Sequence, residues 1–516
     1  MTKPQLIIPM SGLGKRFIAA GFTLPKPLIP VHGEPIIAHV LQMYEGWDDV
    51  IFVVNRTHLR DPELHLEEIL LGLRPQGKIL GIEGHDFGPS YAVLKARDLI
   101  ALDKPVVVNY CDFAGDFDLE EYEKELQSKD ATLLTYTGFH PHLLRNTQFA
   151  YIQKNRLGEV TEIQEKKSFT ANPMSEEASA GSYGYGSGKI LIAAIENQIS
   201  NGYSLNGEFY TSLTIKSVLE QQGKVSSVLM ENFYQWGTPE DFADFNYWTN
   251  SIKKIDERRL GEYTETVQAT VILAAGKGER VASHALVPKP AIPVFGKELW
   301  TMALRSCNRN LKEVIVLRKD TFPFLALPSK VQPLLLDKFT QGQADSARLG
   351  LDALIDSTKS AVNILASDNV LPINFSNEVH GLMNSLDLQI VVWVANNYPP
   401  AELSPQHFSW VKIESSRVVQ VLYKSQPPID EAGWSVITGN FSFYNKEIAT
   451  DLIGKLLAHE ESQINGEFYL DSIISIALQR RINIGAIEIP NYFSLGTVDE
   501  LMTFNYWSGV LMKNFV

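Results

Sequence analysis

An internal repeat constrains the fold of this chain more than any other feature of the sequence. Three segments occur twice, in the same order: Asn-Gly-Glu-Phe-Tyr at 206–210 and 465–469, Phe-Asn-Tyr-Trp at 245–248 and 504–507, and Pro-Lys-Pro at 25–27 and 288–290. Collinear matches at nearly constant spacing are the signature of a repeated unit, and two unrelated domains would share them only by chance. We therefore predict two copies of one domain, at residues 1–250 and 269–516. A charged linker over 251–268 would join them, and it is too poor in Gly and Ser to be a flexible tether.

The composition is typical of a soluble globular protein, and it excludes several classes. Of the 516 residues, 45% are hydrophobic and 21% are charged, and no apolar run reaches the roughly 18–20 residues of a membrane span. Two cysteines, Cys111 and Cys307, are too few for a disulfide framework or a cysteine-only zinc site. A cytoplasmic location is therefore expected. The net charge of −14 disfavours nucleic-acid binding but permits small anionic ligands held by local cations.

Alternating strand and helix patterns in both halves predict an α/β fold. Continuous apolar runs of strand length are typical of buried parallel strands, and helical patterns over 34–44 and 90–100 separate them. The runs lie at 6–8, 50–54 and 106–108 in the first half, and at 271–273, 314–317 and 362–365 in the second. Each half should therefore hold a mostly parallel central sheet with helices packed on it.

A glycine-containing loop follows the first strand of each half. The first half has Gly12, Gly14 and Arg16, with Lys26 ten residues further on inside Pro-Lys-Pro. Loops at the carboxyl ends of parallel strands are where α/β proteins bind ligands. Glycines allow close approach to a polyphosphate, and the two cations supply charge for its oxygens. The second half repeats the arrangement with Gly276, Gly278, Arg280 and Lys289.

These motifs resemble the nucleotidyltransferases that make nucleoside-diphosphate sugars, whose opening motif is Gly-x-Gly-x-Arg followed by Pro-Lys-Pro. The resemblance covers most of both halves and implies two tandem Rossmann-like domains of the glycosyltransferase-A type. It implies that the glycine loop binds a nucleoside triphosphate and that the arginine and lysine stabilise its phosphates. The resemblance is strongest to enzymes of capsule and surface-polysaccharide synthesis.

Further positions match the family pattern. Asp112 and Asp368 each follow a buried strand, and the family's aspartate here binds Mg²⁺; a helix-capping role is the alternative. The family also has Glu-Lys at the acceptor site, which corresponds to Glu165-Lys166 in the first half but to Tyr423-Lys424 in the second. The remaining acceptor positions implied are Gly181 and Gly439, which would line the sugar, and Glu208 and Glu467, which would bind hydroxyls or cap a helix.

Two features depart from the family pattern or leave the substrate open. The family's second metal-binding aspartate is replaced by Gln235 and by Ser494, although Mg²⁺ keeps several waters and tolerates few protein ligands. Acidic residues within 83–88, and within 337–343 of the second half, would suit the exocyclic amine of cytosine or guanine. CTP is therefore slightly favoured.

The sequence thus predicts an enzyme that joins a nucleoside triphosphate to a sugar phosphate and releases pyrophosphate, with the first half as the better-supported site. A homo-oligomer is compatible with the sequence. Two alternatives stay open. One is a glycosyltransferase of the same fold, although its Asp-x-Asp pair is absent after Asp112 and Asp368. The other is a nucleotide-binding module with one or both halves catalytically degenerate.

Overall fold

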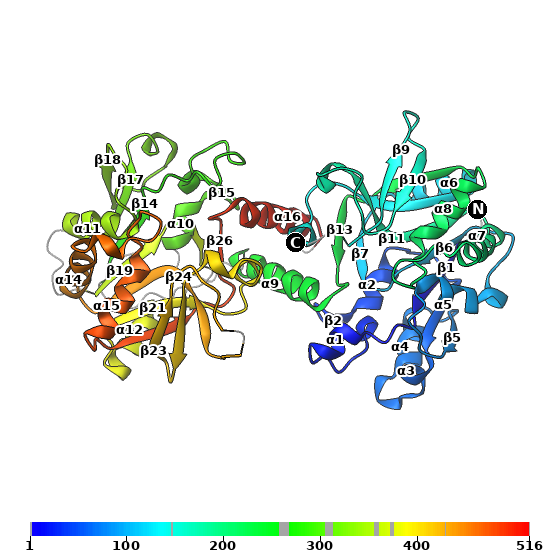
Figure 1. Cartoon of the computed structure of the whole chain (residues 1–516), viewed down its shortest axis with the longest axis horizontal. Helices are drawn as coiled ribbons and strands as arrows, with labels where there is room; N and C mark the ends of the chain where they lie inside the picture. The colour runs from blue at the N-terminus through cyan, green and yellow to red at the C-terminus, as the bar shows by residue number, and fades with distance from the viewer. Residues whose placement is uncertain are drawn as a thin grey trace. The chain divides into compact units, whose positions relative to one another are not determined.

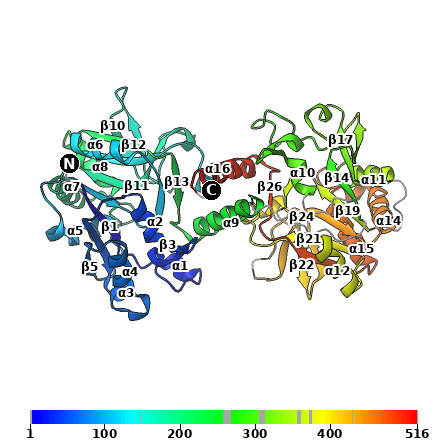
Figure 2. The same cartoon turned by 180° about the vertical axis from the view of Figure 1, so that it is seen from behind.

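The computed structural model describes residues 3–145, 148–256, 268–304, 313–354, 361–371, 376–428 and 430–514. The chain divides into two compact units, unit 1 (Met1–Asn246) and unit 2 (Tyr247–Val516), and each is shown as a labelled ribbon in Figures 1 and 2. The division falls inside helix α9 (Pro239–Asp256), so the first six residues of the expected linker are helical. The remainder of that linker up to residue 267, and Cys307, lie outside the described residues.

The centre of unit 1 is a mixed sheet of nine strands. Its middle strands are parallel, because β1 pairs in parallel with both β4 and β6, and β4 pairs in parallel with β5. Beyond β6 the antiparallel strand β11 links these strands to β8, β9, β10 and β12. The strands are β1 (Gln5–Met10), β4 (Val50–Asn55), β5 (Lys78–Ile82), β6 (Val106–Asn109), β8 (Ala131–Tyr136), β9 (Tyr151–Lys154), β10 (Val160–Gln164), β11 (Glu177–Tyr185) and β12 (Val225–Leu229).

Helices cover both faces of this sheet, as alternating residues of β11 show. Tyr185 reaches one face, where its hydroxyl bonds Thr214 of α8. A Cβ on the preceding Gly184 would collide with Leu126 of α6 on the other face. The helices of unit 1 are α1 (Lys15–Ala19), α2 (Ile36–Gln42), α3 (Arg56–Arg60), α4 (Leu66–Leu73), α5 (Pro89–Lys95), α6 (Leu119–Ser128), α7 (Gly188–Ser200) and α8 (Ser212–Glu220), followed by α9.

Two short antiparallel pairs lie outside the main sheet of unit 1. Strand β7 (Phe113–Asp116), which follows Asp112, pairs with β13 (Asn232–Gln235). Strand β2 (Pro30–Val31) pairs with β3 (Glu34–Pro35). The expected helix over 34–44 therefore begins two residues late, after Pro35, and ends at Gln42. The expected helix over 90–100 is α5 followed by a 3-10 turn at Arg97–Leu99.

The strand pairings of unit 2 follow those of unit 1, with one additional pairing between β23 and β25. Its parallel strands β18, β17, β14 and β19 correspond to β5, β4, β1 and β6, and the antiparallel strand β24 corresponds to β11. The strands are β14 (Gln268–Ala274), β17 (Glu313–Arg318), β18 (Val331–Leu336), β19 (Ala361–Ala366), β21 (Ile390–Ala395), β22 (Trp410–Glu414), β23 (Arg417–Leu422), β24 (Trp434–Phe443) and β25 (Ile484–Glu488), with the short pairs β15 (Pro293–Val294) and β16 (Lys297–Glu298), and β20 (Asn369–Val370) and β26 (Phe493–Ser494).

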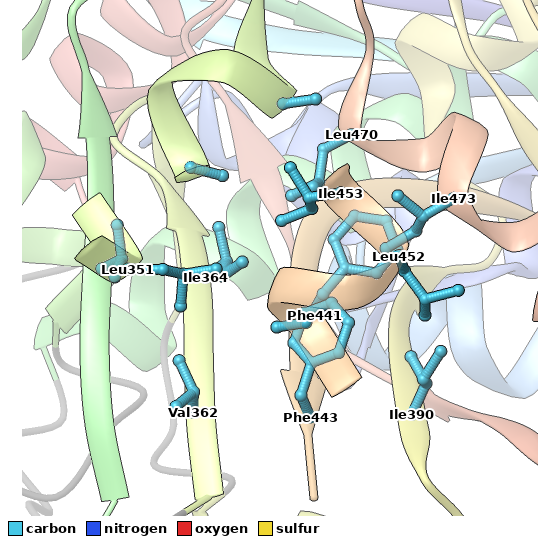
Figure 3. Packing of buried hydrophobic residues seen from close by; sticks show 14 of the residues in the cluster. Leu351, Val362, Ile364, Ile390, Phe441, Phe443, Leu452, Ile453, Leu470 and Ile473 are labelled. Atoms are coloured by element: carbon cyan, nitrogen blue, oxygen red, sulfur yellow. The ribbon is translucent and has the colours of Figure 1, made fainter. Parts of the chain in front are cut away.

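The main core of unit 2 packs helices against this sheet. Figure 3 shows Phe441 and Phe443 of β24 beside Leu452 and Ile453 of α14, all of them fully buried. Burying a side chain of this size contributes about 1.5–3 kcal/mol. The helices are α10 (Leu299–Leu304), α11 (Gln343–Ala353), α12 (Ser376–Leu386), α13 (Pro399–Leu403), α14 (Lys446–Leu457), α15 (Ile473–Gln479) and α16 (Val498–Asn514).

The predicted α/β class is confirmed. All six apolar runs that were expected to be strands are strands, and each extends by one to three residues beyond at least one end of the expected run. Within the described ranges, no helix is long and apolar enough to cross a membrane.

Candidate functional site

A cleft of about 470 Å³ opens in unit 1 where β1 and β6 end. It is lined by the glycine loop after β1, by the residues after β6 and by segments from β10, β11 and β13. All nine residues that the sequence predicted for the first half line this one cleft: Gly12, Gly14, Arg16, Lys26, Asp112, Glu165, Lys166, Gly181 and Glu208.

The glycine loop turns sharply between β1 and helix α1. Gly14 has a φ of 63°, a left-handed conformation that strongly favours glycine over residues with a Cβ. The loop is tied to the sheet by Asn55, whose side-chain amide donates to the carbonyl of Ser11 over 3.3 Å. No protein atom lies within 4 Å of a Cβ built on Gly12 or Gly14, so the loop leaves room for a ligand against its backbone.

Lys26 and Asp112 form an ion pair at the base of the cleft. The Nζ atom of Lys26 lies 2.6 Å from Oδ2 of Asp112, and the two side chains are 21% and 24% exposed. Burial is the largest influence on Lys26 and would lower its pKa, but the charge of Asp112, the hydrogen bond to Asp112 and the nearby Cys111 together outweigh burial, and the pKa is raised. Lys26 is therefore a fixed positive charge in the cleft. Asp112 stands between β6 and β7, so the helix-capping alternative does not apply to it.

The side of the cleft that was predicted to bind the acceptor, called here the acceptor side, carries Glu165 and Lys166. The Nζ atom of Lys166 donates to the hydroxyl of Tyr210 over 2.7 Å and lies 4.4 Å from the centre of that ring. Lys166 has a φ of 54°, which is uncommon for a residue with a Cβ and marks a constrained position. Glu165 accepts a hydrogen bond from the hydroxyl of Ser212. Burial raises the pKa of Glu165, and the hydrogen bond from Ser212 and the nearby Lys166 only partly oppose this.

Gly181 and Glu208 complete the acceptor side. Gly181 has a φ of 106°, and a Cβ there would lie 3.1 Å from the ring of Phe113 and 3.2 Å from that of Tyr110. Only glycine fits this position without strain. Glu208 closes the tight turn over Asn206-Gly207, where it exchanges two backbone hydrogen bonds with Leu205. Glu208 therefore caps no helix, and its side chain is free to face the cleft that it lines.

Unit 2 repeats the phosphate side of this arrangement. Lys289 forms an ion pair with Asp368. Burial opposes ionisation of Asp368, but Lys289 outweighs it and the pKa of Asp368 is lowered. The glycine loop has Gly278 at a φ of 66°, and Gly276 has no atom within 4 Å of a built Cβ.

The acceptor side of unit 2 differs. Lys424 has a φ of 46° and lies 5.0 Å from the ring of Tyr469, as Lys166 lies near Tyr210. Its Nζ atom, however, donates to the carbonyl of His407 over 2.9 Å. Burial lowers the pKa of Lys424; Asp471 opposes this, while Arg280 adds to it. Tyr423 replaces the acid and bonds the hydroxyl of Ser475 over 2.6 Å.

The last two predicted residues of unit 2 keep the backbone of their counterparts. Gly439 of β24 has a φ of 80°, like Gly181 of β11. Glu467 closes an Asn-Gly turn with Ile464, as Glu208 does in unit 1, so the capping alternative does not apply to Glu467 either.

Comparisons with known proteins identify the first half. Residues 6–250 match the family model of the nucleotidyl transferases. The N-terminal half of this chain belongs to the nucleotidyl transferase family. The predicted resemblance is therefore confirmed for that half.

Individual relatives are distant. The chain is similar to the bifunctional protein GlmU of Methanocaldococcus jannaschii, with 26% identity over 274 residues that cover 52% of this chain and 60% of that protein. The GlmU protein of Methanococcus maripaludis strain C7 is also 26% identical, over the same shares of both chains. The chain thus spans about 60% of the length of the curated relatives it matches. Among solved structures, a nucleoside-diphosphate-sugar pyrophosphorylase from Vibrio cholerae is 19% identical, with a TM-score of 0.39 over 46% of this chain and 98% of that one.

The nucleotidyl transferase half also contains residues in or next to the cleft that the sequence analysis did not single out. Tyr110 accepts a hydrogen bond from the backbone of Thr211 through its hydroxyl, over 3.1 Å, and Tyr210 holds Lys166. Tyr210 belongs to the repeated Asn-Gly-Glu-Phe-Tyr segment, so the repeat itself pointed to it. Nothing in the local sequence marked Tyr110 or the buried Asp241 of α9 as part of the site.

Proposed function

We propose that unit 1 catalyses transfer of a nucleotidyl group from a nucleoside triphosphate to a sugar phosphate, with release of pyrophosphate. The observation that carries this proposal is the convergence of two sets of groups on one cleft. Gly12, Gly14, Arg16 and the Lys26–Asp112 pair line one part of it, and Glu165, Lys166 and Glu208 line another. A cleft with cations at two places suits a reaction between two phosphorylated substrates.

The chemistry requires no strong general base. A phosphate oxygen of the acceptor, which is already anionic, attacks the α-phosphorus of the triphosphate. The bond from that phosphorus to the bridging oxygen breaks, and both electrons leave with pyrophosphate. Catalysis is then mainly positioning and neutralisation of charge. Lys26 and Arg16 are placed for the triphosphate, and Lys166 for the acceptor phosphate.

A divalent cation, proposed here as Mg²⁺, fits the residues that are present. Asp112 offers a carboxylate inside the cleft, and oxygen ligands are those that Mg²⁺ prefers. When bound, the ion would neutralise phosphate charge. In unit 2, Asp368 is the corresponding residue. Lys26 and Lys289 form ion pairs with these carboxylates.

We also propose that the nucleoside triphosphate is CTP. Of the acidic residues in 83–88, Asp86 lines the cleft, where its carboxylate pairs with Lys15 over 2.8 Å. Glu83 does not support the proposal, because it is not among the residues that line the cleft. Asp86 is therefore the carboxylate that we propose to accept the exocyclic amine of the base.

We further propose that unit 2 is a second, diverged copy of unit 1. The corresponding strand order of the two sheets supports this, and so do the shared left-handed conformations at Lys166 and Lys424. Unit 2 keeps the lysine–aspartate pair but has Tyr423 in place of the acceptor acid. We therefore assign the transfer reaction to unit 1. The product would serve surface polysaccharide synthesis, and a homo-oligomer stays a prediction for size measurements on the purified chain.

The test is a substrate matrix on the full chain. Each of the common nucleoside triphosphates is incubated with a panel of sugar phosphates and Mg²⁺, and pyrophosphate release and product mass are both measured. Pyrophosphate together with a nucleotide-sugar of the expected mass supports the proposal. Consumption of a nucleotide-sugar without pyrophosphate would favour a glycosyltransferase instead. Thermal stabilisation by nucleotides without turnover would favour a binding module.

A further inference from the structure

Three oxygen atoms converge beside Gly237, in the loop between β13 and α9. A Cβ built on Gly237 would lie 3.7 Å from Oδ2 of Asp112, 3.8 Å from Oδ2 of Asp241 and 3.8 Å from Oε1 of Gln235. Gly237 and Gln235 both line the cleft. Because glycine leaves this point open, two carboxylates and an amide face a small polar space next to the Lys26–Asp112 pair.

Asp241 has an evident structural role, which must be weighed first. It stands three residues after Thr238 at the start of α9. Its backbone N–H donates to the Thr238 hydroxyl over 3.2 Å, and that hydroxyl donates to Oδ2 of Asp241 over 2.9 Å. The Thr238 hydroxyl thus caps the start of α9, and a cap of this kind stabilises a helix by about 0.5–2 kcal/mol. A capping acid is ordinarily exposed to solvent, whereas Asp241 is only 6% exposed.

Gln235 gives an independent indication that a ligand belongs here. Its side chain is 5% exposed, and its Nε2 atom has no hydrogen-bond partner in the described structure. A buried amide without partners costs about 1–3 kcal/mol. Because the oxygen and nitrogen of an amide can exchange places, either end is available to a bound group or to its water.

The corresponding acid of unit 2 is already occupied. Oε2 of Glu500 accepts from the backbone N–H groups of Gly496 and Thr497, each over 2.9 Å, and from the Thr497 hydroxyl over 3.1 Å. Oε1 accepts from the hydroxyl of Tyr398 over 2.6 Å. Asp241 has a lighter set of partners: the Thr238 hydroxyl on Oδ2, and Arg145 at 3.8 Å from Oδ1. Asp241 can therefore accept further hydrogen bonds or bind a cation, whereas the oxygens of Glu500 are already occupied by groups of unit 2.

We propose that Asp241, together with Asp112, holds the divalent cation of unit 1, with the Gln235 amide beside it. This inference rests on the function proposed for unit 1. Asp241 takes the place of the aspartate that is missing at position 235, from a position six residues further along the chain. The three oxygens all lie within 4 Å of one point beside Gly237, and contacts through water would suffice to hold the ion, since Mg²⁺ retains several of its waters. The positive start of α9 opposes a bare cation, so the ion binds together with the polyphosphate.

The experiment uses inorganic tripolyphosphate as a probe that carries no base. Its dissociation constant is measured calorimetrically on the full chain, with Mg²⁺ and separately with EDTA. All proteins carry Asp368→Asn, so that unit 2 lacks its own carboxylate. The ratio of the two constants measures how much the ion tightens binding. Asp241→Asn is compared with Asp112→Asn, and Glu240→Gln is the matched control, because Glu240 is the exposed neighbour of Asp241.

We expect Mg²⁺ to tighten binding about tenfold or more in the parent and in Glu240→Gln. Asp241→Asn and Asp112→Asn should each lose most of that gain, while their affinities in EDTA stay near that of the parent. The double variant should lose little more than either single variant, because both residues hold one ion. Asparagine still accepts the Thr238 hydrogen bond, so the melting temperature of Asp241→Asn should stay close to that of the parent.

Two results would overturn the inference while leaving the proposed function intact. In one, Asp241→Asn keeps the Mg²⁺ effect of the parent and Asp112→Asn loses it. In the other, Asp241→Asn weakens binding equally with Mg²⁺ and with EDTA, which is the behaviour of a purely structural cap. Absence of any Mg²⁺ effect in the parent would also overturn it. Absence of tripolyphosphate binding under both conditions would overturn the phosphate cleft and the proposed function as well.

Discussion

Replacement of Lys26 by alanine tests the proposed chemistry most directly. Lys26 is the cation that contacts Asp112 at 2.6 Å, and its raised pKa keeps it charged at neutral pH. If its ammonium stabilises phosphate charge in the transition state, its removal should cost about 3 kcal/mol, as loss of one oxyanion donor does. At 1.36 kcal/mol per tenfold change, turnover should fall by about a hundredfold or more.

The effect on folding should be much smaller than the effect on turnover. The Lys26 and Asp112 side chains are about one-fifth exposed, so loss of the pair should cost about 1–2 kcal/mol, between the values for exposed and for fully buried pairs. Lys3→Ala is the matched control, because Lys3 pairs with Glu123 at the same N–O distance of 2.6 Å and neither residue lines the cleft. Its turnover should equal that of the parent.

The assay is pyrophosphate release at saturating substrates, with the melting temperature measured in parallel. A parallel Lys289→Ala variant reports whether unit 2 contributes to the rate. Turnover of Lys26→Ala within a few-fold of the parent, in a chain whose unit 2 is also silenced, would refute the role given to Lys26. A loss of turnover that tracks a large fall in melting temperature would also count against it, because misfolding would then explain the result.

Four other substitutions have defined outcomes. Burial raises the pKa of Glu165 in the folded protein. Its protonated side chain therefore favours the folded state at pH values below its pKa in the unfolded chain, and this stabilisation is lost as the pH rises through its pKa in the folded protein. Glu165→Gln should therefore gain melting temperature relative to the parent as the pH rises above about 4, and a pH-independent difference would contradict this. Gly181→Ala should destabilise unit 1 by about 2–4 kcal/mol, because its φ of 106° and the nearby rings exclude a Cβ. Gly72→Ala in α4, where a Cβ meets nothing within 4 Å, should instead be neutral or stabilising by up to about 1 kcal/mol in a denaturant titration. Glu500→Gln should cost about 1–3 kcal/mol in the same titration, because an amide cannot accept all four hydrogen bonds of this carboxylate; parental stability would show that those contacts contribute little.

The parallel half of each sheet was predictable because its strands carry their own signal. The runs at 6–8 and 106–108 are fully apolar, and both are buried in the centre of the sheet. The sequence analysis did not predict the antiparallel strand β11. Its segment from Glu177 to Tyr185 is rich in Gly, Ser and Ala, because close packing of Gly184 against α6 leaves no room for the β-branched residues that usually mark a strand.

The candidate site was predictable to the extent that it was repeated. Lys166 would ordinarily be read as a surface charge, and only its match with Lys424 suggested otherwise. Asp241 could not be found in this way. The pattern Thr238-Pro-Glu-Asp is a common helix start, and its nearness to Asp112 arises only when β13 pairs with β7 and brings Gly237 to the cleft. Such a constellation depends on tertiary pairing, which no local sequence pattern encodes.

The two units resemble each other on the side proposed to bind the triphosphate and differ on the side proposed to bind the acceptor. In both units a lysine is hydrogen-bonded to the aspartate that follows a central parallel strand, β6 in unit 1 and β19 in unit 2. Selection for phosphate binding would explain why both units have this pair. On the acceptor side, Lys166 bonds a tyrosine hydroxyl that lines the cleft, whereas Lys424 bonds a backbone carbonyl. Lys424 thus gives one of its three N–H donors to the backbone, and burial lowers its pKa, so its positive charge is less favoured. Unit 2 should therefore retain polyphosphate binding with a weakened response to sugar phosphates. Tripolyphosphate titrations of Asp112→Asn, with and without the acceptor found for unit 1, would measure this. An acceptor effect as large as that of the parent would contradict it.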